Sequence, residues 1–144
     1  MKRISSEGLE LIKSFESFSH KVYICPAGYK TIGFGHVVKR DENFKKGISW
    51  FEAERILYED IRSAENATLR LIRVPLTQGQ FDALISFTFN LGAAALQRST
   101  LRRKVNREEH DEVPEELLRW VWASGKKLPG LIKRRYAEGM RYMS

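Results

Sequence analysis

Three side chains near the N-terminus, Glu16, Cys25 and Thr31, bring acid, thiol and hydroxyl chemistry into one short stretch. Glu16 follows a predicted helix, Cys25 falls in a turn, and Thr31 begins a predicted strand. Because a helix end followed by a hairpin folds back on itself, the three side chains can line one cleft. A carboxylic acid there can protonate a glycosidic oxygen, while a hydroxyl or thiolate orients water or stabilises positive charge. The spacing alone is weak evidence for a site.

The residues around this trio predict a helix followed by a small antiparallel sheet. Ser5 and Ser6 are good N-caps, and apolar residues recur at helical spacing until about Glu16. Residues 22–38 are rich in β-branched and aromatic residues interrupted by Gly and Pro, which is typical of short antiparallel strands. The hairpin that should position Cys25 is therefore expected directly after the first helix.

From Ser49 onward the sequence predicts helices almost throughout. Ser49 and Glu52 form a capping box that opens a long amphipathic helix running to about Arg73. A second capping box at Thr77 opens a strongly apolar helix that ends at Gly92. This helix is apolar around most of its circumference, so we expect it at the centre of a helical core.

These elements predict an α+β protein formed by a single domain, residues 1–144. A small antiparallel sheet lobe is expected at about 15–48. A helical bundle lobe is expected at about 74–144, together with the N-terminal helix. The long helix would join the two lobes.

Composition excludes several classes of protein. A content of 42% hydrophobic and 30% charged residues argues against disorder. Apolar runs such as Leu91–Leu96 are far shorter than the ~18 residues of a membrane span. Met1–Ser6 carries charge without an apolar segment behind it, so no secretory signal is expected. The single cysteine, Cys25, cannot form an internal disulfide and is compatible with a reducing cytosol.

The net charge of +7 leaves two interpretations open. Most of the excess lies C-terminal to Gln97, which suits either a polyanionic partner or solvated helix faces. A nucleic-acid-binding module is the main rival from another class. The basic residues are not interleaved with exposed aromatic residues, and no zinc-finger, RNA-recognition or basic-zipper signature is present. We therefore expect no nucleic-acid partner.

The motif around the trio resembles the catalytic signature of the phage-type lysozymes, the endolysin muramidases of glycoside hydrolase family 24. Eight residues separate Glu16 from Cys25, five separate Cys25 from Thr31, and the run Ile32–His36 follows. Residues 76–92 resemble the central buried helix of that family. The C-terminal sequence blocks of that family are similar to three segments of this chain, residues 99–104, 120–126 and 128–135. The similarity runs in order along nearly the whole chain, so the combination is specific.

The resemblance implies a lysozyme-like fold and hydrolysis of the β-1,4 bond between N-acetylmuramic acid and N-acetylglucosamine in peptidoglycan. It implies that Glu16 is the general acid and that Thr31 helps to place the attacking water. Cys25 stands where most members have Asp and some have Cys. A thiol is charged only if its pKa falls well below ~8.5, so Cys25 is a base, a nucleophile or an inert bystander.

The resemblance also assigns His36 and four saccharide-contact residues. A Cys–His zinc site or peptidase is not expected, because no further Cys or His clusters with Cys25 and His36. The resemblance pairs His36 with Asp60, an ion pair that would raise the pKa of His36. The positions implied at the saccharide are Val37, Phe89, Asn90 and Ser99, although core packing is the alternative for Phe89. Either Arg134 or Arg135 reaches Glu16, or both are solvated.

The resemblance finally implies how such an enzyme would act. Its partners would be peptidoglycan glycan strands, with no cofactor, no metal and no stable membrane association. We expect a monomer that stays in the host cytoplasm until a separate holin opens the membrane, and that then attacks the periplasmic cell wall. A catalytically silent wall-binding relative and a lytic transglycosylase are the alternatives. Thr31, as a water-placing hydroxyl, favours hydrolysis.

Overall fold

The computed structural model describes residues 2–144 and begins with a helix and a three-stranded sheet. Helix α1 (Ser6–Phe15) starts where the Ser5 hydroxyl accepts a hydrogen bond from the Gly8 N–H. The strands β1 (Ser19–Ile24), β2 (Lys30–Gly33) and β3 (His36–Val37) form an antiparallel sheet in the order β1-β2-β3. The sheet brings Tyr23 opposite Thr31 and Thr31 opposite Val37. The small sheet lobe is therefore confirmed.

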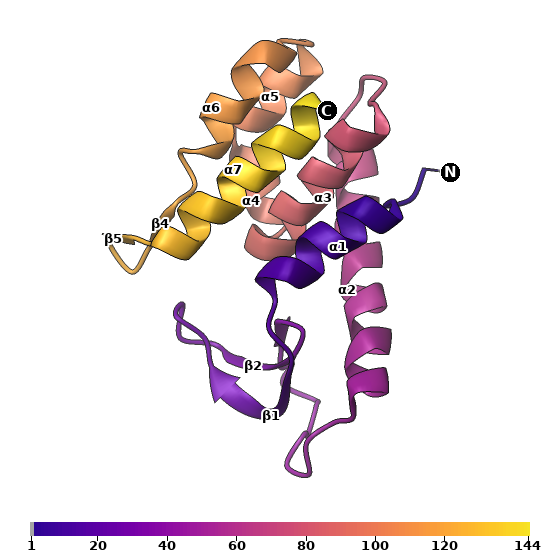
Figure 1. Ribbon diagram of the computed structural model, residues 1–144, viewed down its shortest axis with the longest axis vertical. Coiled ribbons are helices and arrows are strands. Elements are labelled where there is room, and N and C mark those ends of the chain that lie inside the picture. The colour runs from indigo at the N-terminus through magenta and orange to yellow at the C-terminus, as the bar shows by residue number, and fades with distance from the viewer. Residues whose placement is uncertain (1) are drawn as a thin grey trace.

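Helix α2 (Trp50–Leu71) connects the sheet lobe to a helical lobe (Figure 1). Its first turn holds the predicted capping box, in which Ser49 and Glu52 exchange side-chain-to-backbone hydrogen bonds. The helix ends two residues earlier than the sequence predicts, because Ile72 is already extended. None of the helices among residues 2–144 is both long enough and apolar enough to cross a membrane.

The helical lobe contains the remaining elements. They are α3 (Gln78–Leu91), α4 (Ala93–Arg98), α5 (Thr100–Asn106), the short 3-10 helix η1 (His110–Glu112), α6 (Val113–Leu117), the hairpin β4 (Trp122–Ala123) and β5 (Lys126–Lys127), and α7 (Pro129–Met143). Helix α4 occupies most of the segment between Gly92 and Thr100, and α6 ends at Leu117. The predicted α+β architecture, a small antiparallel sheet and a helical lobe joined by a long helix, is confirmed.

Helix α3 links the two hydrophobic cores of the protein. Phe81 and Ile85 belong to a cluster with α1, β2 and α2, whereas Leu84 and Phe87 belong to a cluster with α5, α6 and α7. All four side chains are completely buried. In Figure 1, α7 lies across α3 on one side and α1 lies beside it, so the apolar helix is at the centre, as the sequence predicts.

Replacing Leu84 with alanine should therefore destabilise the protein strongly. Removing a fully buried leucine leaves a cavity, and such substitutions cost about 2–5 kcal/mol of unfolding free energy. The matched control is Leu69→Ala on α2, where the side chain is 40% exposed and the loss should stay below about 1 kcal/mol. Urea unfolding of both variants measures the difference. Equal losses would contradict a central position for α3.

Candidate active site

Glu16 lies at the C-terminal end of α1 and forms an ion pair with the last helix. Its Oε2 atom accepts a hydrogen bond from Arg134 Nη1 at 2.6 Å, and the Glu16 side chain remains 15% exposed. The Arg134 guanidinium group also lies over the ring of Phe15, 5.7 Å from its centroid. Of the two arginines that the sequence leaves open, the structure places Arg134 against Glu16.

Gly35, in the turn between β2 and β3, lies directly against the Glu16 carboxylate. A Cβ atom at this position would clash with Glu16 Oε1 and Cδ, and the backbone φ of +76° also favours glycine. The turn therefore needs glycine at this position to approach the acid closely. This contact fixes the position of the sheet lobe relative to the end of α1.

Cys25 and Thr31 lie in the β1–β2 hairpin that follows Glu16. The turn is closed by hydrogen bonds from Cys25 N–H to the Tyr29 carbonyl at 2.9 Å and from Gly28 N–H to the Cys25 carbonyl at 2.8 Å. Thr31 is buried, and its hydroxyl donates to the Tyr29 carbonyl at 3.0 Å. The hairpin therefore places the thiol and the hydroxyl next to each other, as the spacing predicts.

The environment of Cys25 lowers the pKa of its thiol. Burial raises the pKa of the thiol, but hydrogen bonds from the backbone at Tyr29 and from the Thr31 side chain lower it by more, so that the pKa is below its usual value. The pKa of Tyr23 is raised, by burial first and then by the negative charges of Glu16 and Cys25. Glu16, Cys25 and Tyr23 therefore lie in one electrostatic environment.

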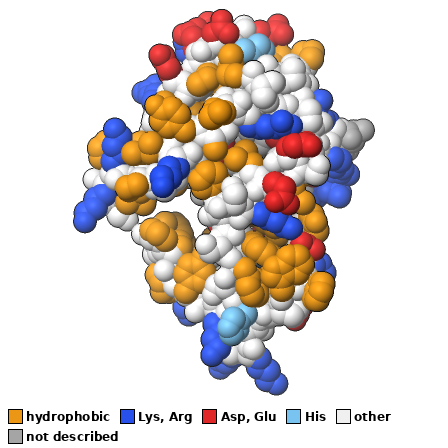
Figure 2. All heavy atoms as spheres, in the orientation of Figure 1, with side chains coloured by type: hydrophobic (Ala, Val, Ile, Leu, Met, Phe, Trp, Pro, Cys, Tyr) orange, Lys and Arg blue, Asp and Glu red, His pale blue; other side chains and the backbone are white. Residues whose placement is uncertain are grey.

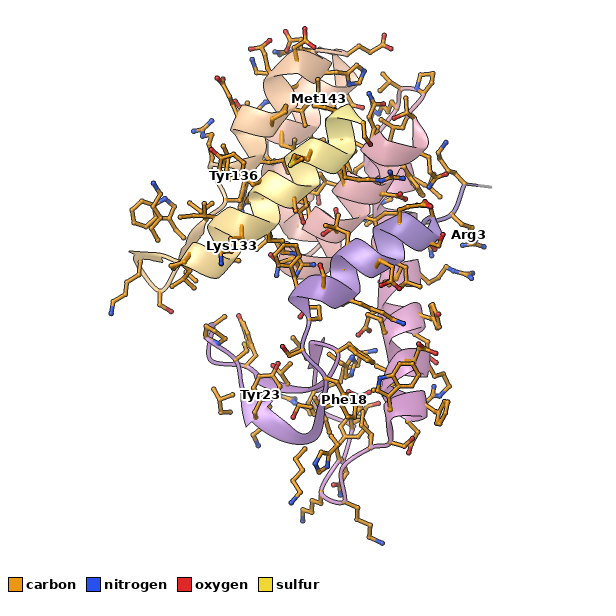
Figure 3. All side chains as sticks on the ribbon, in the orientation of Figure 1. Arg3, Phe18, Tyr23, Lys133, Tyr136 and Met143 are labelled. Atoms are coloured by element: carbon orange, nitrogen blue, oxygen red, sulfur yellow. The ribbon has the colours of Figure 1, made fainter. Side chains whose placement is uncertain are left out.

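A hollow of about 590 Å³ extends from Gly35 between the two lobes. It is lined by β3 and the loop after it, by α2, and by the junction of α3 and α4, and both Val37 and Phe89 face it. Figure 2 shows a notch between the lobes. Figure 3 labels Tyr23 on the sheet-lobe side of that notch and Lys133 of α7 on the helical side. An extended substrate can be held between two lobes arranged in this way.

The other two predicted saccharide contacts lie differently. Asn90 is partly exposed, and its Oδ1 accepts a hydrogen bond from Arg135 Nη2. Ser99 is only 2% exposed and caps α5: its hydroxyl accepts from Arg102 N–H at 3.0 Å and donates to the Leu96 carbonyl at 2.7 Å. The hydroxyl of Ser99 is thus buried and used within the fold, and its contact with saccharide stays a prediction.

His36 fastens β3 to α2 and to the loop after β3. Its Nδ1 atom lies 2.7 Å from Asp60 Oδ2, and its Nε2 atom lies 2.8 Å from Glu42 Oε1. The hydrogen bond with Asp60 raises the pKa of His36 above its usual value, with a further contribution from Glu42. Burial raises the pKa of Glu42, but hydrogen bonds from Lys39 N–H and His36 lower it by more. His36, Asp60 and Glu42 thus form a three-residue cluster that holds β3 against α2.

Within residues 2–144, no group of three or more His, Cys, Asp or Glu side chains is arranged to hold a metal ion. Glu16 does not line the hollow itself but contacts Gly35, which does. An acid close to a cleft between a small sheet and a helical lobe is characteristic of lysozymes.

Comparison with known proteins gives the same class. The family model described as Phage lysozyme matches residues 13–138, so the chain belongs to the phage lysozyme family and is a glycoside hydrolase. It is 42% identical over 139 residues to an endolysin of Acyrthosiphon pisum secondary endosymbiont phage 1, covering 94% of each chain. It is 37% identical over 147 residues to the endolysin of Salmonella phage P22, covering both chains completely.

A solved structure agrees with this assignment. The muramidase domain of SpmX from Asticaccaulis excentricus superimposes with a TM-score of 0.88 at 33% identity, covering 100% of this chain and 99% of that one.

Three neighbours of the site were not recognised from the sequence: Tyr23, Gly35 and Glu42. Gly35 lies within the motif between Phe34 and His36. A glycine inside a strand pattern indicates a tight turn, so this residue could have been found from the sequence. The pattern around Tyr23 indicates a strand and gives no sign of a neighbouring acid. Glu42 lies in a charged loop without periodicity, so the sequence does not show which of its carboxylates contacts His36.

Asp60→Asn should destabilise the protein in a pH-dependent manner. Because the pKa of His36 is raised in the folded state, its stabilisation is fully present below the unfolded value of about 6.5. It is lost as the pH rises through the folded pKa. The gap in unfolding free energy between the unmodified protein and the variant should therefore be larger at pH 6 than at pH 9.

Urea unfolding at the two pH values measures this gap. Glu59→Gln serves as the control, since Glu59 is exposed and pairs with Arg55 on its own helix. A gap that stays constant with pH, or an NMR titration that places the His36 pKa at or below about 6.5, would refute the linkage.

Proposed function

We propose that this protein is an endolysin that hydrolyses the β-1,4 bond between N-acetylmuramic acid and N-acetylglucosamine in bacterial peptidoglycan. The observation that carries the proposal is the position of Glu16, a partly exposed acid at the end of α1 that contacts Arg134 and Gly35. Membership in the phage lysozyme family supports the substrate class.

Glu16 acts as the general acid in this proposal. It donates its proton to the glycosidic oxygen as the bond to the sugar breaks, and a carboxylate remains. Arg134 Nη1, at 2.6 Å, stabilises that carboxylate by a charge-assisted hydrogen bond. The interaction is strongest after the proton has left, so it favours the transition state over the ground state.

Cys25 and Thr31 supply the second half of the reaction. A thiolate at Cys25 stabilises the developing positive charge of the sugar or activates water, and Thr31 helps to place that water. The Thr31 hydroxyl has one proton, which in the free protein goes to the Tyr29 carbonyl. A thiolate at Cys25 competes for the same proton, so the two groups act as a coupled pair.

Val37, Phe89 and Asn90 contact the saccharide in this proposal. Val37 and Phe89 line the hollow from opposite lobes, and an aromatic face suits the apolar face of a sugar ring. The net charge of +7 attracts the enzyme to the anionic wall, an effect that salt weakens. The enzyme acts as a monomer after a separate holin has opened the host membrane.

Glu16→Gln should abolish clearing of purified peptidoglycan. Glutamine keeps the size and shape of the side chain but cannot donate a catalytic proton, and such losses are on the order of 100-fold or more. Glu10→Gln, an exposed position on the same helix, should clear normally. Mass spectrometry of the products separates hydrolysis from formation of an anhydro sugar by transglycosylation. No clearing by the unmodified protein would instead point to a silent wall-binding relative.

Cys25→Ser should impair turnover, whereas Cys25→Asp should retain it. Serine does not ionise near neutral pH, and aspartate is charged without help from its surroundings. We expect a loss of about tenfold or more in kcat for the serine variant, which corresponds to about 1.4 kcal/mol in the barrier. Initial rates of turbidity loss at equal protein concentration measure this. Full turnover by Cys25→Ser would make the thiol a bystander.

A further inference from the structure

Glu138 is a fully buried carboxylate on α7 that the proposed mechanism does not use. Its side chain is 0% exposed and lies between α7 and the central helix α3. The Ser86 hydroxyl of α3 donates a hydrogen bond to Glu138 Oε2 at 2.5 Å. A buried charge of this kind is unfavourable unless partners of opposite charge surround it.

Two arginines flank this carboxylate. Arg134 Nε lies 3.4 Å from Glu138 Oε2, and Arg135 Nε lies 3.3 Å from Glu138 Oε1. Burial raises the pKa of the Glu138 carboxyl group above its usual value, while the two guanidinium groups and the Ser86 hydroxyl act in the opposite direction. Two cations that face one acid favour its carboxylate form.

Arg134 joins Glu138 to the candidate general acid. Its Nη1 atom donates to Glu16 Oε2 at 2.6 Å, and its Nε atom donates to Glu138. Its Nη2 atom faces the carbonyl and hydroxyl oxygens of Ser86, each at 3.4 Å. One buried guanidinium group is therefore shared between two carboxylates on different helices.

The sharing of Arg134 by two carboxylates matters because Glu16 must be protonated before it can donate a proton. When Glu16 takes up a proton, Arg134 loses one of its two negative partners while remaining buried. If Glu138 were absent, that protonation would leave an isolated buried cation, which is strongly unfavourable. With Glu138 present, Arg134 keeps an ion pair throughout the reaction cycle.

We propose that Glu138 is a positioning residue that serves as the second counter-ion of Arg134 and thereby allows Glu16 to exchange its proton. The inference rests on the proposed role of Glu16 as general acid. Among the described residues, Arg135 on α7 also faces Glu138 and Glu16, and Tyr23 on β1 faces Glu16 and, on its other side, Cys25 in the hairpin. Arg135 also binds Asn90, so Glu138 orients arginines toward both the acid and a proposed saccharide contact.

The test is the pH–rate profile of Glu138→Gln. Glutamine preserves the shape of the side chain but removes its charge, so Glu16 becomes the only carboxylate partner of Arg134. Protonation of the acid is then less favourable, and the alkaline limb of kcat should move to lower pH by about one unit, a tenfold loss on that limb, with little change in KM. In an Arg134→Gln background, Glu138→Gln should produce no further movement.

Asp82→Asn provides a matched control. Asp82 is another fully buried carboxylate between α3 and α7, and it pairs with Arg141 at 2.7 Å. It contacts the start of α1, at Ser5, rather than the end that carries Glu16. This variant should lose stability without any movement of the pH–rate profile. A superimposable profile for Glu138→Gln, or the same movement in the Arg134→Gln background, would overturn the proposal.

A second measurement does not depend on enzymatic activity. The NMR signal of the Arg134 Nε–H group should move toward the position of a free arginine and exchange faster with water in Glu138→Gln. In Asp82→Asn only the Arg141 signal should respond. An unchanged Arg134 signal overturns the proposal even if the protein has no muramidase activity. If Glu138→Gln does not fold, Glu138→Asp, which keeps the charge but withdraws it by one methylene, should show smaller changes in the same direction.

Discussion

The ion pair between Glu16 and Arg134 is the interaction on which the rest of the site depends. It joins residues that are 118 positions apart in the chain, one at the end of α1 and one on α7. Helices α1 and α7 contact each other less than each of them contacts α3, which packs against both. The apolar core around α3 therefore does more than stabilise the helical lobe, because it sets the distance across which acid and arginine meet.

The parts of the fold that were predictable are those with strong local signals. The capping boxes at Ser49 and Thr77 identified the starts of α2 and α3, and Gly92 identified the end of α3. Helix α4 was missed because it has only six residues and follows Gly92 directly, so no periodicity could develop. Short elements of this kind are formed by tertiary packing rather than by local propensity.

The candidate site was predictable only in part, for a different reason. The motif identified Glu16, Cys25 and Thr31, but α7 buries Arg134, Arg135 and Glu138 toward the core. A helix that buries ion pairs does not display the apolar stripe that normally identifies its inner face. The sequence therefore could not distinguish the arginine that contacts Glu16 from its neighbour, nor recognise that Glu138 lies between them. The helix cap formed by Ser99 could not be predicted either, because it depends on the unrecognised α4.

The separation of Glu16 from Arg134 along the chain also affects the timing of synthesis. At about 5–20 residues per second, a ribosome adds Arg134 roughly 6–24 s after Glu16. During this interval α1 and the sheet hairpin can form, but the acid has no arginine and Gly35 has no fixed position relative to the helical lobe. The arrangement that we associate with catalysis can exist only after α7 has left the ribosome and docked on α3. A nascent chain therefore carries Glu16, Cys25 and Thr31 for most of its synthesis without a completed site.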